Sequence, residues 1–128
     1  MTPLNIVRKA KAKNLDLIAV TDHNSTLQGP EIFRLGKREG LAVLCGAEIT
    51  TREEVHCLAY VGTEEQRLDL QLYLEHHLPP IPNDPEIFGY QLWVDEQEKV
   101  LGEAPYLLIS AIDQTIDHLL RLEQPKLH

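Results

Sequence analysis

Two short apolar runs separated by a helical pattern constrain this fold more than any other feature of the chain. The first run, 17–21, ends in the polar residues 22–24, and the second, 41–45, follows a pattern typical of a helix over 29–40. Strand, helix and strand within about 30 residues form a parallel βαβ unit, whose strands end at the same edge of the sheet. α/β folds keep their chemistry at that edge. Three polar side chains are expected there: Asp22, His23 and Glu48.

A third strand is expected over 55–61, a β-branched and aromatic run that Gly62 closes. The connection from the second strand is short, with a polar turn at 52–54. The third strand should therefore fold back antiparallel on the second. This hairpin would carry His56 back towards Glu48.

Helices are expected on both sides of these strands. Thr2 and Pro3 are typical of a helix start, with a hydroxyl cap followed by proline at the first helical position. A later helix is expected over 64–77, with Leu68 and Leu72 facing the core.

The last third of the chain predicts extended structure, a hairpin and a final helix. Four prolines within 79–85 require an extended connection. The runs 90–94 and 99–101 indicate a β-hairpin with Trp93 as its buried anchor. Ser110-x-x-Asp113 is a capping box that would open the final helix. Its inner face would carry Ile112, Ile116, Leu119 and Leu120.

The composition suits one globular domain without a membrane segment. The chain has 128 residues, of which 43% are hydrophobic. No apolar run approaches the roughly 20 residues of a membrane span and the amino end has no signal pattern, so we expect a cytoplasmic protein. The net charge of −8 argues against nucleic-acid binding but not against a small phosphorylated substrate, because cations can invert the local field. Cys45 and Cys57 are expected to be buried, reduced thiols.

Asp22, His23, Glu48 and His56 are candidates for metal binding at this edge. Imidazoles and carboxylates are ligands for zinc, manganese or iron, and a carboxylate can bridge two ions. Asp22 suits either a ligand or a residue that orients the neighbouring imidazole. The same residues also fit a polar turn, an exposed strand end and a strand-facing histidine, and their spacing does not decide between these interpretations.

The other histidines are expected to be solvated. His76 and His77 end a helix, where cationic side chains interact favourably with the helix dipole. His118 falls on the polar side of the final helix, and His128 is the last residue. Cys45 precedes Glu48 closely, but a core thiol is the better interpretation.

Three motifs stand at the expected strand ends: Val-Thr-Asp-His-Asn-Ser over 20–25, Gly-Ala-Glu-Ile-Thr-Thr over 46–51, and Val-His-Cys-Leu over 55–58. Together they resemble the polymerase-and-histidinol-phosphatase (PHP) family of metal-dependent phosphoesterases. The specific motifs cover roughly the first half of the chain, and 107–117 is similar to a bacterial branch of the family. The resemblance implies a distorted (β/α)7 TIM-like barrel that holds two or three divalent ions and hydrolyses phosphate esters with metal-activated water.

The resemblance also implies roles for individual residues. His23, Glu48 and His56 would bind zinc, manganese or iron, and Glu48 would bridge two ions. Asp22 would be a further ligand or an orienting neighbour, so the expected catalytic group is Asp22, His23 and Glu48. Two residues would face a small phosphorylated substrate: Asn24 and Ser25.

The chain departs from the family pattern in its missing motifs. The opening His-x-His motif would lie upstream of the first helix, the later histidine and the closing Asp-x-His would lie beyond the last, and such barrels commonly need roughly 200 residues. We therefore expect a single partial barrel domain over 1–128, with a motif-bearing βαβ core and hairpin in 1–62. The segment 63–128 would add a helix, the proline-rich connection, a second hairpin and the final helix.

Two functions follow from this expectation. Phosphate ester hydrolysis is the family role. For these 128 residues alone, a non-catalytic remnant that binds at most one ion, or an interaction domain, fits the incomplete ligand set better. The open sheet edges of a partial barrel predict self-association or low stability.

Overall fold

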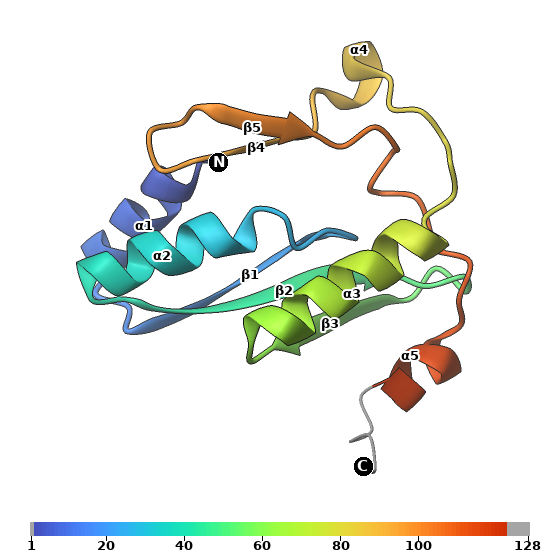
Figure 1. Cartoon of the computed structure of the whole chain (residues 1–128), viewed down its shortest axis with the longest axis horizontal. Coiled ribbons are helices and arrows are strands. Elements are labelled where there is room, and N and C mark those ends of the chain that lie inside the picture. The colour runs from blue at the N-terminus through green and yellow to red at the C-terminus, as the bar shows by residue number, and fades with distance from the viewer. Residues whose placement is uncertain (1, 123–128) are drawn as a thin grey trace.

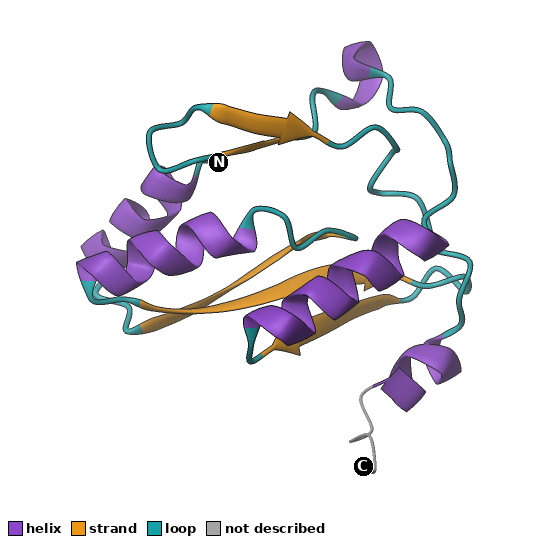
Figure 2. Cartoon of the chain, in the orientation of Figure 1, coloured by secondary structure: helices purple, strands orange, loops and turns teal. Residues whose placement is uncertain are grey.

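The computed structural model describes residues 2–122, which form an open three-stranded sheet with helices on one of its faces (Figure 1). The strand order is β1-β2-β3, and a separate two-stranded hairpin, β4-β5, completes the β structure drawn in Figure 2. The α/β class is confirmed, whereas the described residues close no barrel and the partial barrel is not confirmed. The elements are α1 (Pro3–Ala12), β1 (Leu17–His23), α2 (Gly29–Glu39), β2 (Ala42–Thr50), β3 (His56–Val61), α3 (Glu64–His77), α4 (Pro85–Phe88), β4 (Leu92–Val94), β5 (Val100–Glu103) and α5 (Ile116–Leu122).

The sheet has the predicted pairing, with β1 parallel to β2 and β2 antiparallel to β3. Both β1 and β2 run beyond the apolar runs that predicted them. The parallel ladder persists to the pair of His23 with Glu48, and the Asn24 N–H then donates to the Glu48 carbonyl at 2.9 Å. The expectation that Asp22, His23 and Glu48 follow the strands is therefore wrong, because all three lie inside strand ends.

The start of α1 and the end of α2 have the capping residues that the sequence predicted. The Thr2 hydroxyl accepts a hydrogen bond from the Asn5 N–H, and Pro3 occupies the first helical position of α1. Gly40 ends α2 with φ of 76°, a left-handed conformation that glycine adopts without steric cost.

The helices α1, α2, α3 and α5 pack on one side of the sheet, which we call the covered face. One hydrophobic cluster joins α1 and α2 to β1 and β2, with Ile32 and Leu35 at 0% and 1% exposure. A second cluster joins α3 and the chain around α5 to β2. Because side chains alternate along a strand, every second residue points to the opposite side, the bare face. Its large apolar side chains are 39–56% exposed: Leu17, Leu44, Leu58 and Tyr60.

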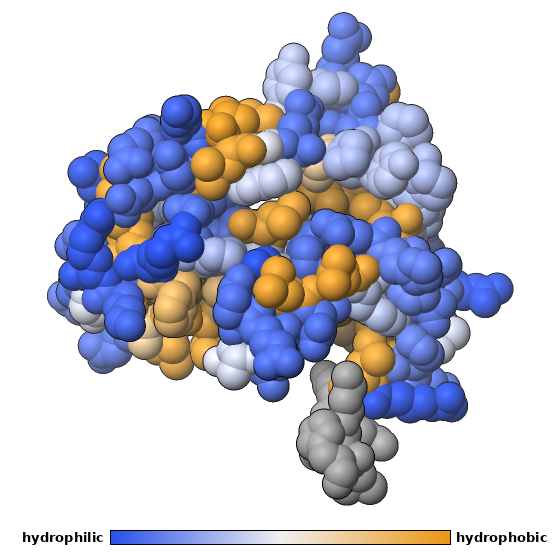
Figure 3. All heavy atoms as spheres, in the orientation of Figure 1, coloured by the Kyte–Doolittle hydropathy of each residue, from blue (hydrophilic) through white to orange (hydrophobic). Residues whose placement is uncertain are grey.

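The helix α3 has the predicted bounds but turns a different face to the sheet. Leu68 and Leu72 are 48% and 63% exposed, and apolar side chains are visible on the outer surface of α3 in Figure 3. The buried residues are Arg67, Gln71 and Leu74, which follow helical spacing. The prediction that Leu68 and Leu72 face the core is wrong, because two polar residues with buried partners take the inner positions.

The chain after α3 confirms the hairpin and corrects the final helix. Trp93 is only half-buried in the hairpin, and the short helix α4 was not predicted. The helix α5 begins at Ile116, not near Ser110. The Thr115 hydroxyl accepts from the His118 N–H at 3.3 Å, and the Glu53 carboxylate accepts from the Ile116 N–H at 3.2 Å. Ile112 thus lies in the preceding loop, and Leu120 is exposed.

The two cysteines are unpaired and half-buried, rather than fully buried as predicted. Cys45 lies on the covered face, and burial raises the pKa of its thiol. Cys45 therefore points away from Glu48, which follows it three residues later on the other face.

No helix among residues 2–122 is long and apolar enough to cross a membrane.

Candidate metal and substrate site

The Glu48 carboxylate lies between two imidazoles on the bare face. Its Oε2 is 3.0 Å from His23 Nδ1, and its Oε1 is 3.6 Å from His56 Nδ1. The sheet register produces this meeting, since His23 pairs directly with Glu48 and His56 pairs with Thr50, two residues further along β2. The structure brings these side chains together as the hairpin predicted; their role as metal ligands stays a prediction.

The two imidazoles face different oxygens of Glu48, so the arrangement is two pairs that share one carboxylate. Two ligand atoms that bind one ion at about 2.1 Å lie roughly 3 Å apart, which is close to the spacing of the His23 pair. Among residues 2–122, no group of three or more His, Cys, Asp or Glu side chains is arranged to hold one ion. Imidazole and carboxylate are donor types that bind divalent cations, and the two pairs share Glu48. His23 and His56 are about half exposed, at 49% and 58%, so solvent and ligands can reach them.

Asp22 lies next to His23 in β1 and therefore points to the other side of the strand. It lines a cavity at the end of β1 instead of joining His23 and His56 around Glu48. Burial raises the pKa of Asp22 above its usual range, and the neighbouring His23 opposes that shift. An orienting or substrate-facing position fits this geometry better than a place beside Glu48.

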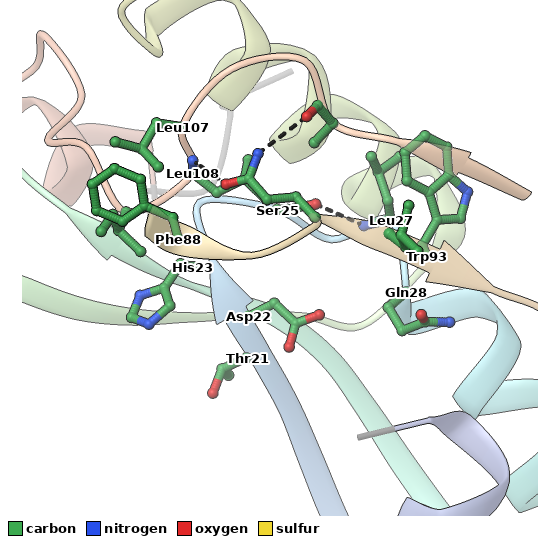
Figure 4. A pocket seen from close by; sticks show the side chains of 14 residues that line it. Thr21, Asp22, His23, Ser25, Leu27, Gln28, Phe88, Trp93, Leu107 and Leu108 are labelled. Carbon is green, nitrogen blue, oxygen red and sulfur yellow. Dashed lines mark hydrogen bonds between the residues drawn. The ribbon is translucent and has the colours of Figure 1, made fainter. Parts of the chain in front are cut away.

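The cavity has a volume of about 430 Å³ and lies between the end of β1 and the β4-β5 hairpin (Figure 4). His23 lines it from one side, so the cavity and the pair of His23 and Glu48 share this one residue. Ser25 also lines the cavity, with its hydroxyl accepting from the Leu27 N–H at 3.3 Å. The Ser25 hydroxyl proton is free to be donated, which keeps its predicted position beside a substrate chemically reasonable.

Asn24 has a different environment from the substrate-facing one that the resemblance implied. It is 2% exposed, and its amide nitrogen donates to the carbonyls of Leu108 and Ser110, both at 2.7 Å. Its amide oxygen accepts from the Thr50 N–H at 3.1 Å. The substrate role of Asn24 stays a prediction that these contacts do not favour, because the amide already joins three backbone segments.

Two glutamines that sequence reasoning missed hold the far wall of the cavity. Gln28 bonds both the N–H and the carbonyl of Val94, at 3.0 and 2.7 Å, as a neighbouring strand would. Gln91 donates to Tyr106 at 2.7 Å and accepts from Leu108 at 2.9 Å. No local pattern marks these glutamines, since their partners lie elsewhere in the chain.

His76 is exposed as predicted, whereas His77 and His118 are only half-exposed. His77 Nδ1 is 2.7 Å from the Asp113 carboxylate, and His118 Nδ1 is 2.8 Å from the Tyr73 hydroxyl. Hydrogen bonds from Gln114 and His77 hold the pKa of Asp113 below its usual range. These contacts fasten α3 to α5 and to the chain just before it, apart from Glu48. His128 lies outside the described residues.

Comparison with known proteins places the chain in a family. An uncharacterized protein of Methanocaldococcus jannaschii is 43% identical over 51 residues, a match that covers 40% of this chain and 30% of the archaeal protein. The match thus spans less than a third of that relative, and no solved structure matches the chain. The PHP domain matches residues 1–122, which includes all three motifs described above. The chain belongs to the PHP domain family.

Proposed function

We propose that this protein takes part in the metal-dependent hydrolysis of phosphate esters. The observation that carries this proposal is the Glu48 carboxylate, whose two oxygens face the imidazoles of His23 and His56. Membership of the PHP domain family suggests the same metal-dependent phosphoesterase role. His23, Glu48 and His56 would hold zinc, manganese or iron, and Glu48 would be shared between ions.

Bound cations would neutralise the phosphate charge and activate water at neutral pH. The residues that line the cavity include no lysine or arginine, so no side chain there supplies positive charge apart from a protonated His23. A phosphate dianion beside Asp22 would need cations for charge balance. Asp22 and His23 would orient the substrate and its attacking water at the end of β1, with Ser25 as a hydroxyl donor.

Metal binding is the first test of the proposal. Calorimetric titration with Zn²⁺ and Mn²⁺ should show binding to the wild-type chain and its loss in Glu48→Ala. His23→Ala should weaken binding by about tenfold or more, because one of two neutral nitrogen donors is removed. His76→Ala is the matched control, since this exposed histidine on α3 lies apart from Glu48. Unchanged affinity in both Glu48→Ala and His23→Ala would overturn the site.

Activity is the second test, on a panel of phosphomonoesters and phosphodiesters with each metal present. Metal-dependent turnover that Glu48→Ala removes would support the enzyme. A second candidate, a non-catalytic metal-binding or interaction domain, is favoured by the exposed apolar bare face. Metal binding without turnover of any panel member would favour that second candidate.

A further inference from the structure

The cavity beside Asp22 and His23 has one polar wall and one apolar wall. The polar wall comes from the end of β1 and the loop that follows, with Thr21, Asp22, His23 and Ser25 beside one apolar residue, Leu27 (Figure 4). The opposite wall comes from α4, the hairpin and the loop 107–109. Its apolar side chains are Phe88, Leu92, Trp93, Leu107, Leu108 and Ile109.

Two glutamines also line the cavity, but they do not make its apolar wall a polar surface for a ligand. The amide groups of Gln28 and Gln91 are bonded to the backbone of the hairpin and of the loop that follows it. They hold the apolar wall in place but have little hydrogen-bonding capacity left for a ligand. The groups that can bond a ligand therefore lie on the β1 side, next to His23.

We propose that the apolar wall binds a flat, ring-bearing alcohol group of the phosphate ester, while the phosphate lies toward His23 and Glu48. This inference rests on the proposed function, because that function places the phosphate at the imidazole side. The volume of about 430 Å³ is within the range of small-molecule sites, which combine apolar walls with a few polar groups. Phe88 and Trp93 offer aromatic surfaces against which a ring can pack. A small polar alcohol such as glycerol would leave this wall unfilled.

Trp93 makes the proposal testable without turnover. It is the one tryptophan of the chain, so intrinsic fluorescence reports on this wall directly. Phenylphosphonate and methylphosphonate carry the same non-hydrolysable head group and differ by the ring. With the chain saturated by Zn²⁺, phenylphosphonate should bind at least tenfold more tightly, roughly the effect of removing a phenyl ring from water. It should also shift the Trp93 emission, and methylphosphonate should not.

Two substitutions on α4 provide a matched pair. Phe88→Ala removes a side chain of the apolar wall and should reduce the preference for phenylphosphonate by roughly threefold to tenfold. Ile87→Ala removes a neighbouring side chain that is 71% exposed and outside the cavity lining, so it should change neither affinity. Neither substitution should alter the Zn²⁺ affinity, because both lie away from Glu48.

The outcomes separate this inference from the proposed function. Zn²⁺ binding with equal affinities for the two phosphonates and a constant Trp93 emission would overturn the inference and leave the metal site standing. An equal effect of Phe88→Ala and Ile87→Ala would overturn it as well. Absence of Zn²⁺ binding to the wild-type chain would overturn the proposed function, and this inference with it.

Discussion

The two faces of the three-stranded sheet have opposite properties. On the covered face, side chains of β1 and β2 pack under α1, α2 and α3, and the central residues are almost fully buried. On the bare face, Leu17, Leu44, Leu58 and Tyr60 are 39–56% exposed. Glu48 and its two histidine neighbours, His23 and His56, lie at one end of this bare face.

Within the same strands, the covered face therefore contributes to stability and the bare face carries the candidate site. Adjacent residues of one strand serve different faces, as Ile49 and Glu48 do: Ile49 is 2% exposed in a hydrophobic cluster, and the Glu48 side chain is 30% exposed. Substitutions on the covered face should therefore cost stability. Substitutions on the bare face should instead change binding and association.

The largest effect should come from truncation in the covered core. Leu35→Ala removes a side chain that is 1% exposed, and the free energy of unfolding should fall by about 2–5 kcal/mol, the usual cost of lost burial plus a cavity. Leu17→Ala on the bare face, where Leu17 is 56% exposed, should cost less than about 1 kcal/mol. Urea unfolding followed by circular dichroism measures both. Equal losses would show that the bare face is covered in solution.

Asn24 should show the next largest effect, because its amide joins the sheet to the loop after the hairpin. Asn24→Asp keeps the shape and the acceptor for the Thr50 N–H but turns a carboxylate toward the carbonyls of Leu108 and Ser110. Loss of two donors at a buried position should cost about 2–3 kcal/mol of unfolding free energy.

The matched control for Asn24 is Asn5→Asp in the first turn of α1. An acidic residue there interacts favourably with the helix dipole, so stability should stay the same or rise slightly. Urea unfolding of the two variants side by side measures the contrast. A stable Asn24→Asp chain with an unchanged denaturation midpoint would show that the amide is not a structural connection.

The sequence predicts most of the motif-bearing half because its signals are local. Apolar runs, the Thr2 cap and Gly40 mark elements within a few residues, and the short 51–55 connection implies the hairpin that brings His56 to Glu48. Strand ends were less predictable, since hydrogen bonding between strands extends β1 and β2 past their apolar residues.

The other half could not be predicted to the same depth because distant contacts determine it. The start of α5 has a local cap, Thr115, but also bonds to Glu53, 63 residues earlier in the chain. The inner face of α3 is taken by Arg67 and Gln71, which both bond Thr26, so the apolar pattern that favoured Leu68 and Leu72 pointed to the wrong face. Composition and periodicity carry no information about such partners.

Self-association through the bare face should respond strongly to a single charge. The chain exposes 8387 Å², against about 6,900 Å² for a compact protein of 14.6 kDa. Glu48 is the one carboxylate among the strand residues of the bare face, and it lies between two histidines, so two copies of a chain with net charge −8 could meet there without strong repulsion. Leu58→Lys should raise the dimer dissociation constant by tenfold or more with little change in unfolding free energy.

Sedimentation velocity measures this association. Leu72→Lys is the control, since Leu72 is 63% exposed but lies on the outer surface of α3. A larger effect of Leu72→Lys would move the association to α3. A wild-type chain that remains monomeric at high concentration, with a cooperative melting transition, would contradict self-association altogether.

The smallest effect concerns a polar contact on the covered side. The Arg67 guanidinium bonds both oxygens of Glu64 and the buried Thr26 hydroxyl, and the Arg67 side chain is only 9% exposed. Hydrogen bonds from Arg67 lower the pKa of Glu64 from its ordinary value of 4.5. A carboxyl group whose pKa is lower in the folded chain stabilises that chain above its unfolded pKa, and the contribution disappears as the pH falls through the folded value.

Glu64→Gln should therefore be less stable than wild type at pH 7 and equal to it at an acidic pH below the folded pKa of Glu64, where the carboxyl group is protonated in both states. Because the Glu64 side chain is 61% exposed, solvent screening limits the difference at pH 7 to about 1 kcal/mol or less. Glu65→Gln, at the next position of the same helical turn, makes no such pair and should show no pH-dependent difference. Urea unfolding at both pH values measures the contrast. If Glu64→Gln still had a lower free energy of unfolding than wild type at low pH, the loss would come from side-chain packing and not from charge. The covered face would then owe its stability to its apolar clusters and not to this ion pair.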